Sequence, residues 1–410
     1  MTPFVYRCTL CGRTYARDEV SYLCPACGAE YHPGMPLRGV LEVAFDREVL
    51  CRSVNDGESD TQTFVPVERE FFPVFPVGQT PFLPAPRLAH ELGCSHLHIK
   101  NDASNPSGSL KDRASFLVVA EALRLGEQKI AAASTGNAAS ALAAVCASAG
   151  LDAIIFVPAS APRPKLAQML LYGATVVPVD GTYDDAFALS LRYTAEEGGV
   201  NRNTAYHPLT IEGKKTAGLE IFRQNRNAVP DVIVVPVGDG VIISGIHKAF
   251  LDLRDAGLIE RLPRLLGVQA ERSDAIHRFV ATGIYSDAAN PVTVADSISV
   301  RTPSNAYLAR NAVVNSRGAT VTVSDEQILT AQRLLARTTG LFAEPAAAAT
   351  VAGLRAALSA GIVDPHEMTV LLVTGHGLKD VDAALSGVTV PRPVPPDMAS
   401  VRKFLGSRPQ

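Results

Sequence analysis

One lysine stands where a short polar loop turns into an apolar run. The loop Asn105–Ser109 leads through Leu110 to Lys111, and the mainly apolar stretch Ala114–Ala120 follows. An amine held at such a junction can lie near an acceptor and stay reachable, which is what condensation with an aldehyde cofactor requires. The segment alone is equally typical of a solvated lysine at a helix start, so its interpretation depends on other parts of the chain.

Three further segments place small polar residues or glycines directly after a strand-like run. They are Ser134–Asn137, Gly238–Gly245 and Thr374–Asp380. In parallel α/β proteins the carboxyl ends of the strands face the ligand crevice, so we expect these segments to meet there.

Each of these segments has a chemical and a structural interpretation. Ser134–Asn137 could bind a carboxylate through backbone N–H groups and hydroxyls, or cap a helix. Gly238–Gly245 could cradle a phosphate or form a tight turn, and the Asp239 side chain should then point away from the phosphate. The Thr374 hydroxyl could bond a pyridine nitrogen, whereas His376 is interpreted as a structural histidine.

The elements around these segments alternate between strand-like and helix-like runs. Six strand-like runs are predicted over residues 96–100, 129–133, 153–157, 175–179, 232–236 and 370–373. Five helix-like runs are predicted over residues 138–149, 164–172, 183–196, 245–255 and 325–338. Apolar strands that alternate with helices indicate parallel sheets covered on both faces.

Four cysteines near the start of the chain have the spacing of a metal site. They form two Cys-x-x-Cys pairs with twelve residues between the pairs, namely Cys8, Cys11, Cys24 and Cys27. Two such knuckles can bring four thiolates around zinc at about 2.3 Å each. Four protein ligands leave no open position, so we expect a structural zinc ribbon rather than a catalytic metal.

The bulk composition narrows the function classes. The chain has 410 residues, a net charge of -3, 47% hydrophobic residues and seven cysteines. These values predict more than one domain and a reducing, cytoplasmic location, without a disulfide framework. The sequence shows no block of like charge, no membrane-length apolar run and no export signal, so we expect neither nucleic-acid nor membrane binding.

Taken in order, these motifs resemble the threonine synthase family of fold-type II pyridoxal-phosphate (PLP) enzymes. Lys165–Gln168 with Tyr172–Ala174, Glu212–Thr216 and Phe342–Ala348 extend the similarity to roughly residues 70–385. Some members also carry a cysteine ribbon at the N-terminus.

The resemblance implies an α/β fold with two doubly wound parallel-sheet domains and the cofactor in the cleft between them. We expect the zinc ribbon at residues 1–40 and a large PLP-binding domain at 41–100 and 210–390. A small substrate domain at 101–209 and an extended tail at 391–410 complete the chain. Fold-type II enzymes are commonly dimers, so a homodimer is expected.

The resemblance also assigns roles. Lys111 would carry the cofactor as a Schiff base and move protons at Cα and Cβ of a small amino-acid substrate. The remaining cofactor contacts are expected from Asn137 at the ring oxygen, Thr374 at the pyridine nitrogen, and Gly238, Asp239, Gly240, Val241, Ile242 and Ser244 around the phosphate. The substrate contacts are expected from Ser134, Thr135, Gly136, Ala138, His207 and Thr210.

The chain departs from the family where the substrate phosphate would bind. The family usually has threonine at position 138 and Asn-Ser-x-Asn-Pro-x-Arg at 204–210. This chain has Ala138, Thr204, Ala205, His207 and Thr210. Each charge-assisted bond to a phosphate contributes roughly 1.5–3 kcal/mol, so losing several would weaken phosphate binding on the order of thousands-fold.

Replacement donors are therefore needed. Ile242 stands where the family has a side-chain donor, so the cofactor phosphate must rely on Ser244 or the backbone. Arg163, Lys165, Arg301 and His207 are candidates for a relocated anion clamp on the substrate side.

The sequence therefore predicts a PLP-dependent lyase that eliminates or replaces a β- or γ-substituent of a small amino acid. Three alternatives stay open: a true threonine synthase that converts O-phosphohomoserine, a cysteate synthase-like enzyme that uses O-phosphoserine, and a catalytically silent PLP-binding homologue. A dinucleotide fingerprint at the glycine loop is disfavoured because Ile243 occupies its last glycine position.

Overall fold

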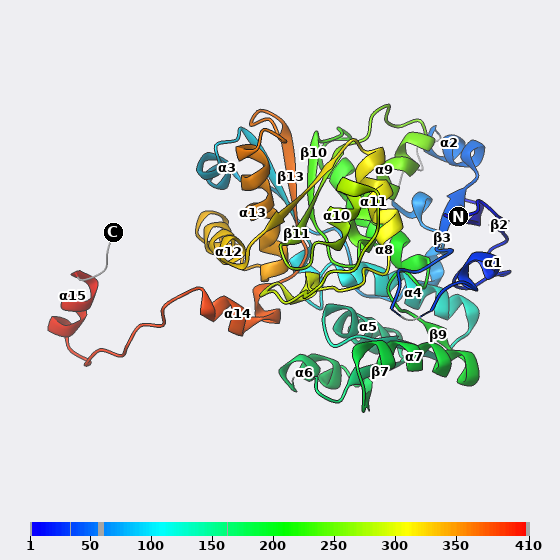
Figure 1. The fold of residues 1–410 in the computed structure, drawn as a ribbon, viewed down its shortest axis with the longest axis horizontal. Coiled ribbons are helices and arrows are strands. Elements are labelled where there is room, and N and C mark those ends of the chain that lie inside the picture. The colour runs from blue at the N-terminus through cyan, green and yellow to red at the C-terminus, as the bar shows by residue number, and fades with distance from the viewer. Residues whose placement is uncertain (1, 33, 56–60, 162, 407–410) are drawn as a thin grey trace.

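The structure is a computed structural model that describes residues 2–32, 34–55, 61–161 and 163–406, without the side chains of residues 54, 55 and 163–165. The described residues form a three-stranded, a six-stranded and a four-stranded sheet. Figure 1 shows the two larger sheets one above the other, with the N-terminal segment beside both.

The six-stranded sheet is built from two separate parts of the chain. Its order is β12-β11-β10-β13-β5-β4, and the strands are parallel except for the antiparallel edge strand β4. The bounds are β4 (Phe82–Pro84), β5 (His96–Asn101), β10 (Val232–Pro236), β11 (Arg264–Ala270), β12 (Ala319–Val323) and β13 (Met368–Val373).

Helices cover both faces of this sheet, as the uninterrupted apolar strands predicted. One face packs against α3 (Pro86–Leu92), α12 (Asp325–Thr339) and α13 (Pro345–Ser359). The other face packs against α8 (Leu209–Gln224), α9 (Val241–Asp255), α10 (Ala275–Thr282) and α11 (Ala306–Asn315).

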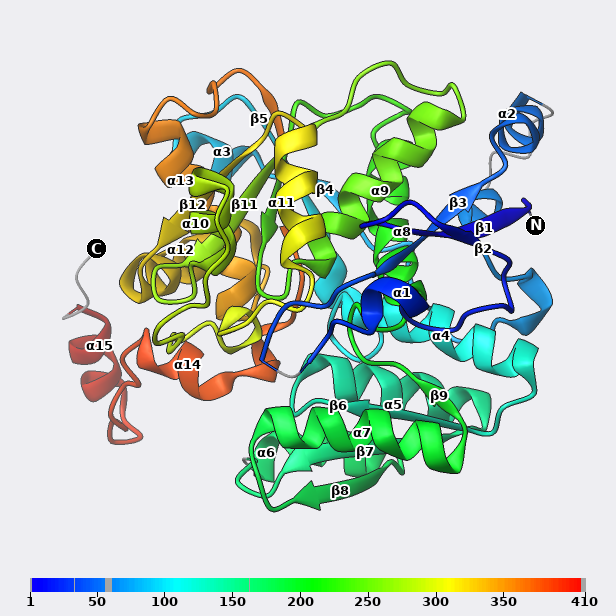
Figure 2. The ribbon, with the colours of Figure 1, turned by 45° about the vertical axis from the view of Figure 1, so that its right-hand side comes forward.

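The four-stranded sheet is entirely parallel and has the order β8-β7-β6-β9. Its strands are β6 (Lys129–Ala133), β7 (Asp152–Pro158), β8 (Thr175–Val179) and β9 (Val200–Asn201). α4 (Lys111–Leu125), α5 (Asn137–Ala149) and α6 (Arg163–Leu171) lie on one side and α7 (Tyr183–Glu197) on the other. Figure 2 shows this layered unit below the larger one.

The N-terminal sheet extends past the boundary expected at residue 40. β1 (Phe4–Cys8) pairs with β2 (Thr14–Tyr15) and with β3 (Leu41–Phe45), both antiparallel. In sequence, α1 (Pro25–Gly28) lies between β2 and β3, and α2 (Arg47–Asn55) follows β3. The Tyr6 and Val43 side chains are buried in the same core as α4, so the sheet is continuous with the body of the molecule.

The C-terminal segment differs from the extended tail that was expected. α14 (Val381–Ser386) is followed by a non-helical stretch and then by α15 (Met398–Gly406), which lies apart from the rest of the chain in Figure 1. The Asp397 carboxylate accepts hydrogen bonds from the Ser400 backbone N–H and hydroxyl, which caps the start of this helix. Residues 391–395 form neither helix nor strand, but the chain after them is helical. None of the described helices has the length and apolar character that crossing a bilayer requires.

Candidate active site

A cavity of about 530 Å³ opens between the two larger sheets. The segments that follow β6, β9, β10 and β13 line it, so the carboxyl ends of strands from both sheets meet there. Its volume is in the range of cavities that hold small ligands and cofactors.

Lys111 is the first residue of α4 and lines this cavity. Its side-chain amine has no hydrogen bond or ion pair to any described residue. Burial lowers the pKa of the Lys111 amine, and the nearby Glu344 and Asp239 carboxylates oppose that effect only in part. A lowered pKa favours the neutral, nucleophilic amine.

The two residues after Lys111 hold it in place. The Asp112 carboxylate accepts hydrogen bonds from the backbone N–H and the hydroxyl of Ser107, which closes the loop. Arg113 is buried and bonds Asp102 at 2.6 Å and Glu220 at 2.7 Å. The polar loop is thus fixed from both sides, and the amine is directed from a rigid helix start.

The turn after β6 lies in the same cavity. Ser134, Thr135, Gly136, Asn137 and Ala138 all line it. The Asn137 amide donates to Glu344 Oε2 at 2.9 Å and to Ser297 Oγ at 3.2 Å. The side chain assigned to the cofactor's ring oxygen is therefore held by a buried carboxylate. Burial raises the pKa of Glu344.

The glycine loop after β10 forms the wall beside the start of α9. Gly238, Asp239, Gly240, Val241 and Ile242 line the cavity. Gly240 has φ +85°, and a Cβ there would lie 2.6 Å from the Cβ of Ala309, so only glycine fits. Asp239 Oδ1 accepts bonds from the N–H and the hydroxyl of Ser304, each at 3.2 Å. The loop thus presents its backbone and the helix N-terminus to an anion.

Thr374 follows β13 and lines the cavity from the larger sheet. Its carbonyl accepts the Leu110 N–H at 2.9 Å, which joins the end of this strand to the loop of Lys111. His376 does not line the cavity, and its Nδ1 accepts the Leu378 N–H at 3.1 Å, a structural role in the loop.

Three residues assigned to ligands from the sequence are not part of this cavity. The Ser244 hydroxyl donates to the Gly240 carbonyl and accepts from Asn305. The Thr210 hydroxyl donates to the carbonyl of His207, whose ring accepts the Leu209 N–H. All three side chains are buried in local packing, and burial lowers the pKa of His207 to about 4.

Of the other residues expected to bind the substrate anion, the structure describes the side chain of Arg301 alone. Arg301 lines the cavity but its side chain is exposed at the rim. The side chains of Arg163 and Lys165 lie outside the described residues.

Sequence reasoning missed three buried charged side chains in the cavity wall, namely Arg202, Lys214 and Glu344. Lys214 and Glu344 stood inside motifs that carried the family resemblance, but nothing in a single sequence places them beside Lys111. Arg202 directly follows β9, just before the segment that departs from the family pattern.

The N-terminal segment also supplies part of the wall. Tyr31, Gly34, Met35 and Leu37 line the cavity, and the Leu37 N–H donates to the Ser304 carbonyl at 2.9 Å. This segment links α1 to β3, so the cysteine-bearing unit adjoins the site.

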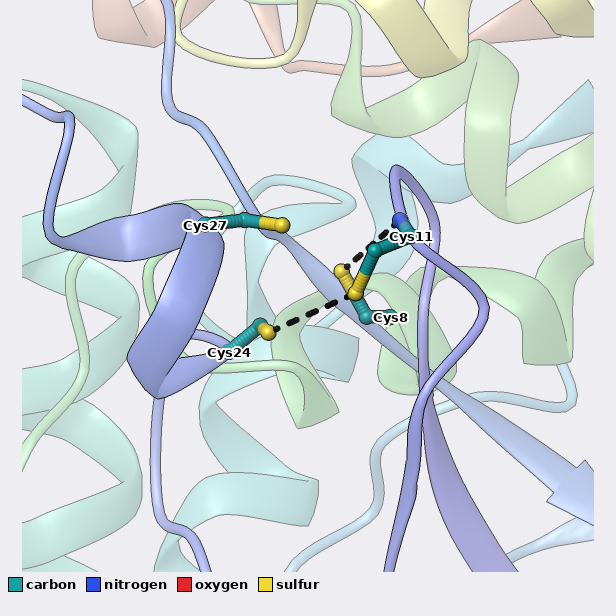
Figure 3. A group of neighbouring side chains, drawn as sticks. All are labelled: Cys8, Cys11, Cys24 and Cys27. Atoms are coloured by element: carbon teal, nitrogen blue, oxygen red, sulfur yellow. Dashed lines mark hydrogen bonds between the residues drawn. The ribbon is translucent and has the colours of Figure 1, made fainter.

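The four cysteines converge at one point, as Figure 3 shows. The sulfur atoms of Cys8, Cys11, Cys24 and Cys27 lie within 4.8 Å of one another, and those of Cys11 and Cys24 are 3.8 Å apart. A tetrahedral site with zinc–sulfur bonds of about 2.3 Å places its sulfurs about 3.8 Å apart. The donor set and its spacing therefore fit a metal ion.

The fold and the cavity define a class: an α/β protein with a reachable lysine, a glycine-rich cradle and a polar turn at the meeting point of two mainly parallel sheets. The family described as pyridoxal-phosphate dependent enzymes matches residues 75–375. The chain belongs to this family. The cradle and the unpartnered Lys111 amine fit a phosphate-bearing aldehyde, so the residues present suit that cofactor.

Similar proteins narrow the family further. Threonine synthase from Methanocaldococcus jannaschii is 37% identical over 97% of this chain and 98% of its own length. Threonine synthase from Methanosarcina acetivorans is 36% identical with the same coverage. The crystal structure of a threonine deaminase from T.th. has a TM-score of 0.62 and 28% identity, and the match covers 73% of this chain and 92% of that one.

Proposed function

We propose that this protein is a PLP-dependent lyase that eliminates or replaces a β- or γ-substituent of a small amino acid. The observation that carries the proposal is the unpartnered Lys111 amine in a cavity with the glycine cradle and the Ser134–Asn137 turn. When bound, PLP supplies an electron sink that acidifies the bonds at Cα of an amino acid.

Side chains and backbone groups of the protein bind the substrate and the cofactor and move the protons. The Lys111 amine holds the cofactor aldehyde and then moves protons at Cα and Cβ of the substrate. Ser134, Thr135 and the adjoining backbone N–H groups hold the substrate carboxylate at the start of α5. Thr374 offers a neutral hydroxyl to the ring nitrogen, which limits how far negative charge spreads into the ring.

The cofactor phosphate is assigned to the backbone of Gly238–Ile242. These N–H groups lie at the start of α9, where the helix dipole favours an anion. Asn137, held by Glu344, orients the ring. The two sheets and the N-terminal wall enclose the site, which limits the access of water to the reacting atoms.

Zinc is the metal that we propose for the cysteine cluster, in a structural role. Four thiolates complete its coordination, so no position is left for substrate. A homodimer and a cytoplasmic location remain proposals from the sequence.

A true threonine synthase is the second candidate, because relatives with that name align along nearly the whole chain. The altered positions 138, 204, 205, 207 and 210 favour the broader proposal over this one.

A substrate panel tests the proposal. The holoenzyme is mixed with O-phosphohomoserine, O-phosphoserine, threonine and serine, and the cofactor absorbance and product release are followed. We expect at least one amino acid to turn over, with the activity lost in Lys111→Ala. Efficient conversion of O-phosphohomoserine to threonine at roughly ten per second would favour the second candidate. A colourless protein that binds no PLP contradicts both.

A further inference from the structure

The buried cations of this chain fall into two groups. Lys100, Lys215 and Lys248 are buried, and each contacts a carboxylate, as does Arg113. These side chains do not line the cavity. Pairing offsets the cost of removing a charge from water.

Arg202 and Lys214 are the exceptions. Both side chains are only 1% exposed, both line the cavity, and neither contacts a carboxylate within the described part of the chain. A buried cation without an anion costs several kcal/mol unless a ligand or solvent compensates. The unpaired buried cations therefore coincide with the ligand cavity.

Local bonds fix the Arg202 guanidinium but leave donors free. Its Nε donates to Ser115 Oγ and its Nη1 to Thr204 Oγ1, each at 3.1 Å. Its Nη2 is buried and has no hydrogen-bond partner among the described residues. A guanidinium has five N–H donors in a planar fork, which suits the paired oxygens of a carboxylate or phosphate.

Lys214 lines the same cavity from a different element. It lies on α8 against the first turns of α9, where a Cβ at Gly245 would come within 3.0 Å of its Cβ. Burial lowers the pKa of its amine, the charges of Lys111 and Arg202 lower it further, and Asp239 opposes them, so these groups share one electrostatic environment. An arriving anion would reverse this shift and hold the amine protonated.

The position of Arg202 indicates which ligand brings the anion. β9 pairs in parallel with β6, and Ala131 is the partner of Asn201. Arg202 therefore emerges next to the Ser134–Asn137 turn proposed for the substrate carboxylate, rather than from the glycine loop of the cofactor phosphate.

We propose that Arg202 and Lys214 form an oxyanion subsite that binds an anionic group on the side chain of the substrate, such as a phosphate ester or a second carboxylate. This inference rests on the proposed function and names its substrate class. The subsite takes over the task once expected of His207 and Thr210, which lie outside the cavity. The phosphate of PLP is a second anion with the same oxyanion chemistry, so the test must distinguish it from an anionic group of the substrate.

The test compares matched ligands. Holoenzyme is titrated with O-phosphoserine against serine, and with O-phosphohomoserine against homoserine, with the cofactor absorbance as readout. The variants are Arg202→Met, Lys214→Met and the control Arg192→Met, an exposed arginine that does not line the cavity. PLP affinity is measured separately for each variant.

We expect the wild type to prefer the phosphorylated partner in at least one pair. Arg202→Met and Lys214→Met should each reduce that preference by about 10- to 100-fold, the range of a bond to a charged group. Binding of serine and homoserine, and of PLP, should stay within about threefold. Arg192→Met should leave the preference unchanged.

Two outcomes overturn the proposal. In one, the variants lose PLP affinity while the preference persists, so the cations serve the cofactor. In the other, the wild type binds neither phosphorylated ligand better than its unphosphorylated partner. It also shows no preference for an acidic amino acid such as aspartate or glutamate.

A thermal readout separates these failures from failure of the proposed function. Inorganic phosphate should raise the unfolding temperature of wild type more than that of Arg202→Met. This result does not depend on whether the holoenzyme turns over any amino acid. Arg202 has no carboxylate partner among the described residues, so without phosphate Arg202→Met should lose only the hydrogen bonds to Ser115 and Thr204 and unfold close to wild type. Equal stabilisation of both proteins by phosphate would contradict the subsite.

Discussion

Arg113 offers the clearest link between a buried charge network and the catalytic lysine. Lys100 and Arg113 face Asp102 and Glu220, and these four side chains are at most 5% exposed. Two cations balance two anions. Arg113→Met would leave two carboxylates against one lysine in a buried region, which costs about 3–5 kcal/mol.

That cost is a large part of the roughly 5–15 kcal/mol that stabilises a typical domain. We expect a lower denaturation midpoint in urea and reduced turnover, since Arg113 is two residues from Lys111. Arg113→Lys keeps the charge but loses the paired geometry, so it should fall between wild type and Arg113→Met.

The matched control is Arg192→Met, because Arg192 and Glu196 form an ion pair with side chains 73% and 56% exposed. Removing an exposed pair should change stability by less than about 1 kcal/mol. If Arg113→Met and Arg192→Met unfold at the same urea concentration, the network does not hold the lysine loop as described.

Two further predictions concern the N-terminal wall and pH. Cys24→Ser should lower both the bound zinc, measured by metal analysis, and the turnover, measured by an activity assay. The control Cys94→Ser should change neither quantity. Full turnover by a metal-free chain would show that the cysteine unit does not support the cavity wall. Burial lowers the pKa of His207 to about 4, below its ordinary value of about 6.5. Between these two pH values His207 is protonated in the unfolded chain but neutral in the folded chain. The contribution of His207 to stability should therefore fall by about 3 kcal/mol as pH drops from 6.5 to 4. His207→Asn keeps an acceptor for the Leu209 N–H and should flatten this part of the urea stability profile; an unchanged slope would refute the assignment.

The sequence predicted the elements that carry strong local patterns. Continuous apolar runs marked β6, β7 and β10 within a residue or two, because buried parallel strands need apolar side chains on both faces. The junctions after these strands were also identified, and the structure brings Lys111 and Thr374 into one cavity.

What the sequence did not reveal depends on tertiary contacts. β11 and β12 were not identified, although both are short apolar runs. α15 was missed because the prolines before it dominate the local pattern. Arg202 and Lys214 could not be distinguished from ordinary surface cations, since their burial depends on strands and helices distant in sequence.

The residues before position 40 illustrate the same limit. Cys spacing predicted a metal site, but no local signal indicates that Met35 and Leu37 reach the cavity. Conversely, His207 and Thr210 stand at positions that the family uses to bind substrate, yet their side chains turn into local packing.

The most direct test of the account is to find the lysine that carries the cofactor. Lys111 and Lys214 are the two lysines in the described cavity wall. Holoenzyme would be reduced with borohydride, digested and mapped by mass spectrometry. The account predicts the pyridoxyl adduct on Lys111 and its absence in Lys111→Ala. An adduct on Lys214, or none on either residue, would contradict it.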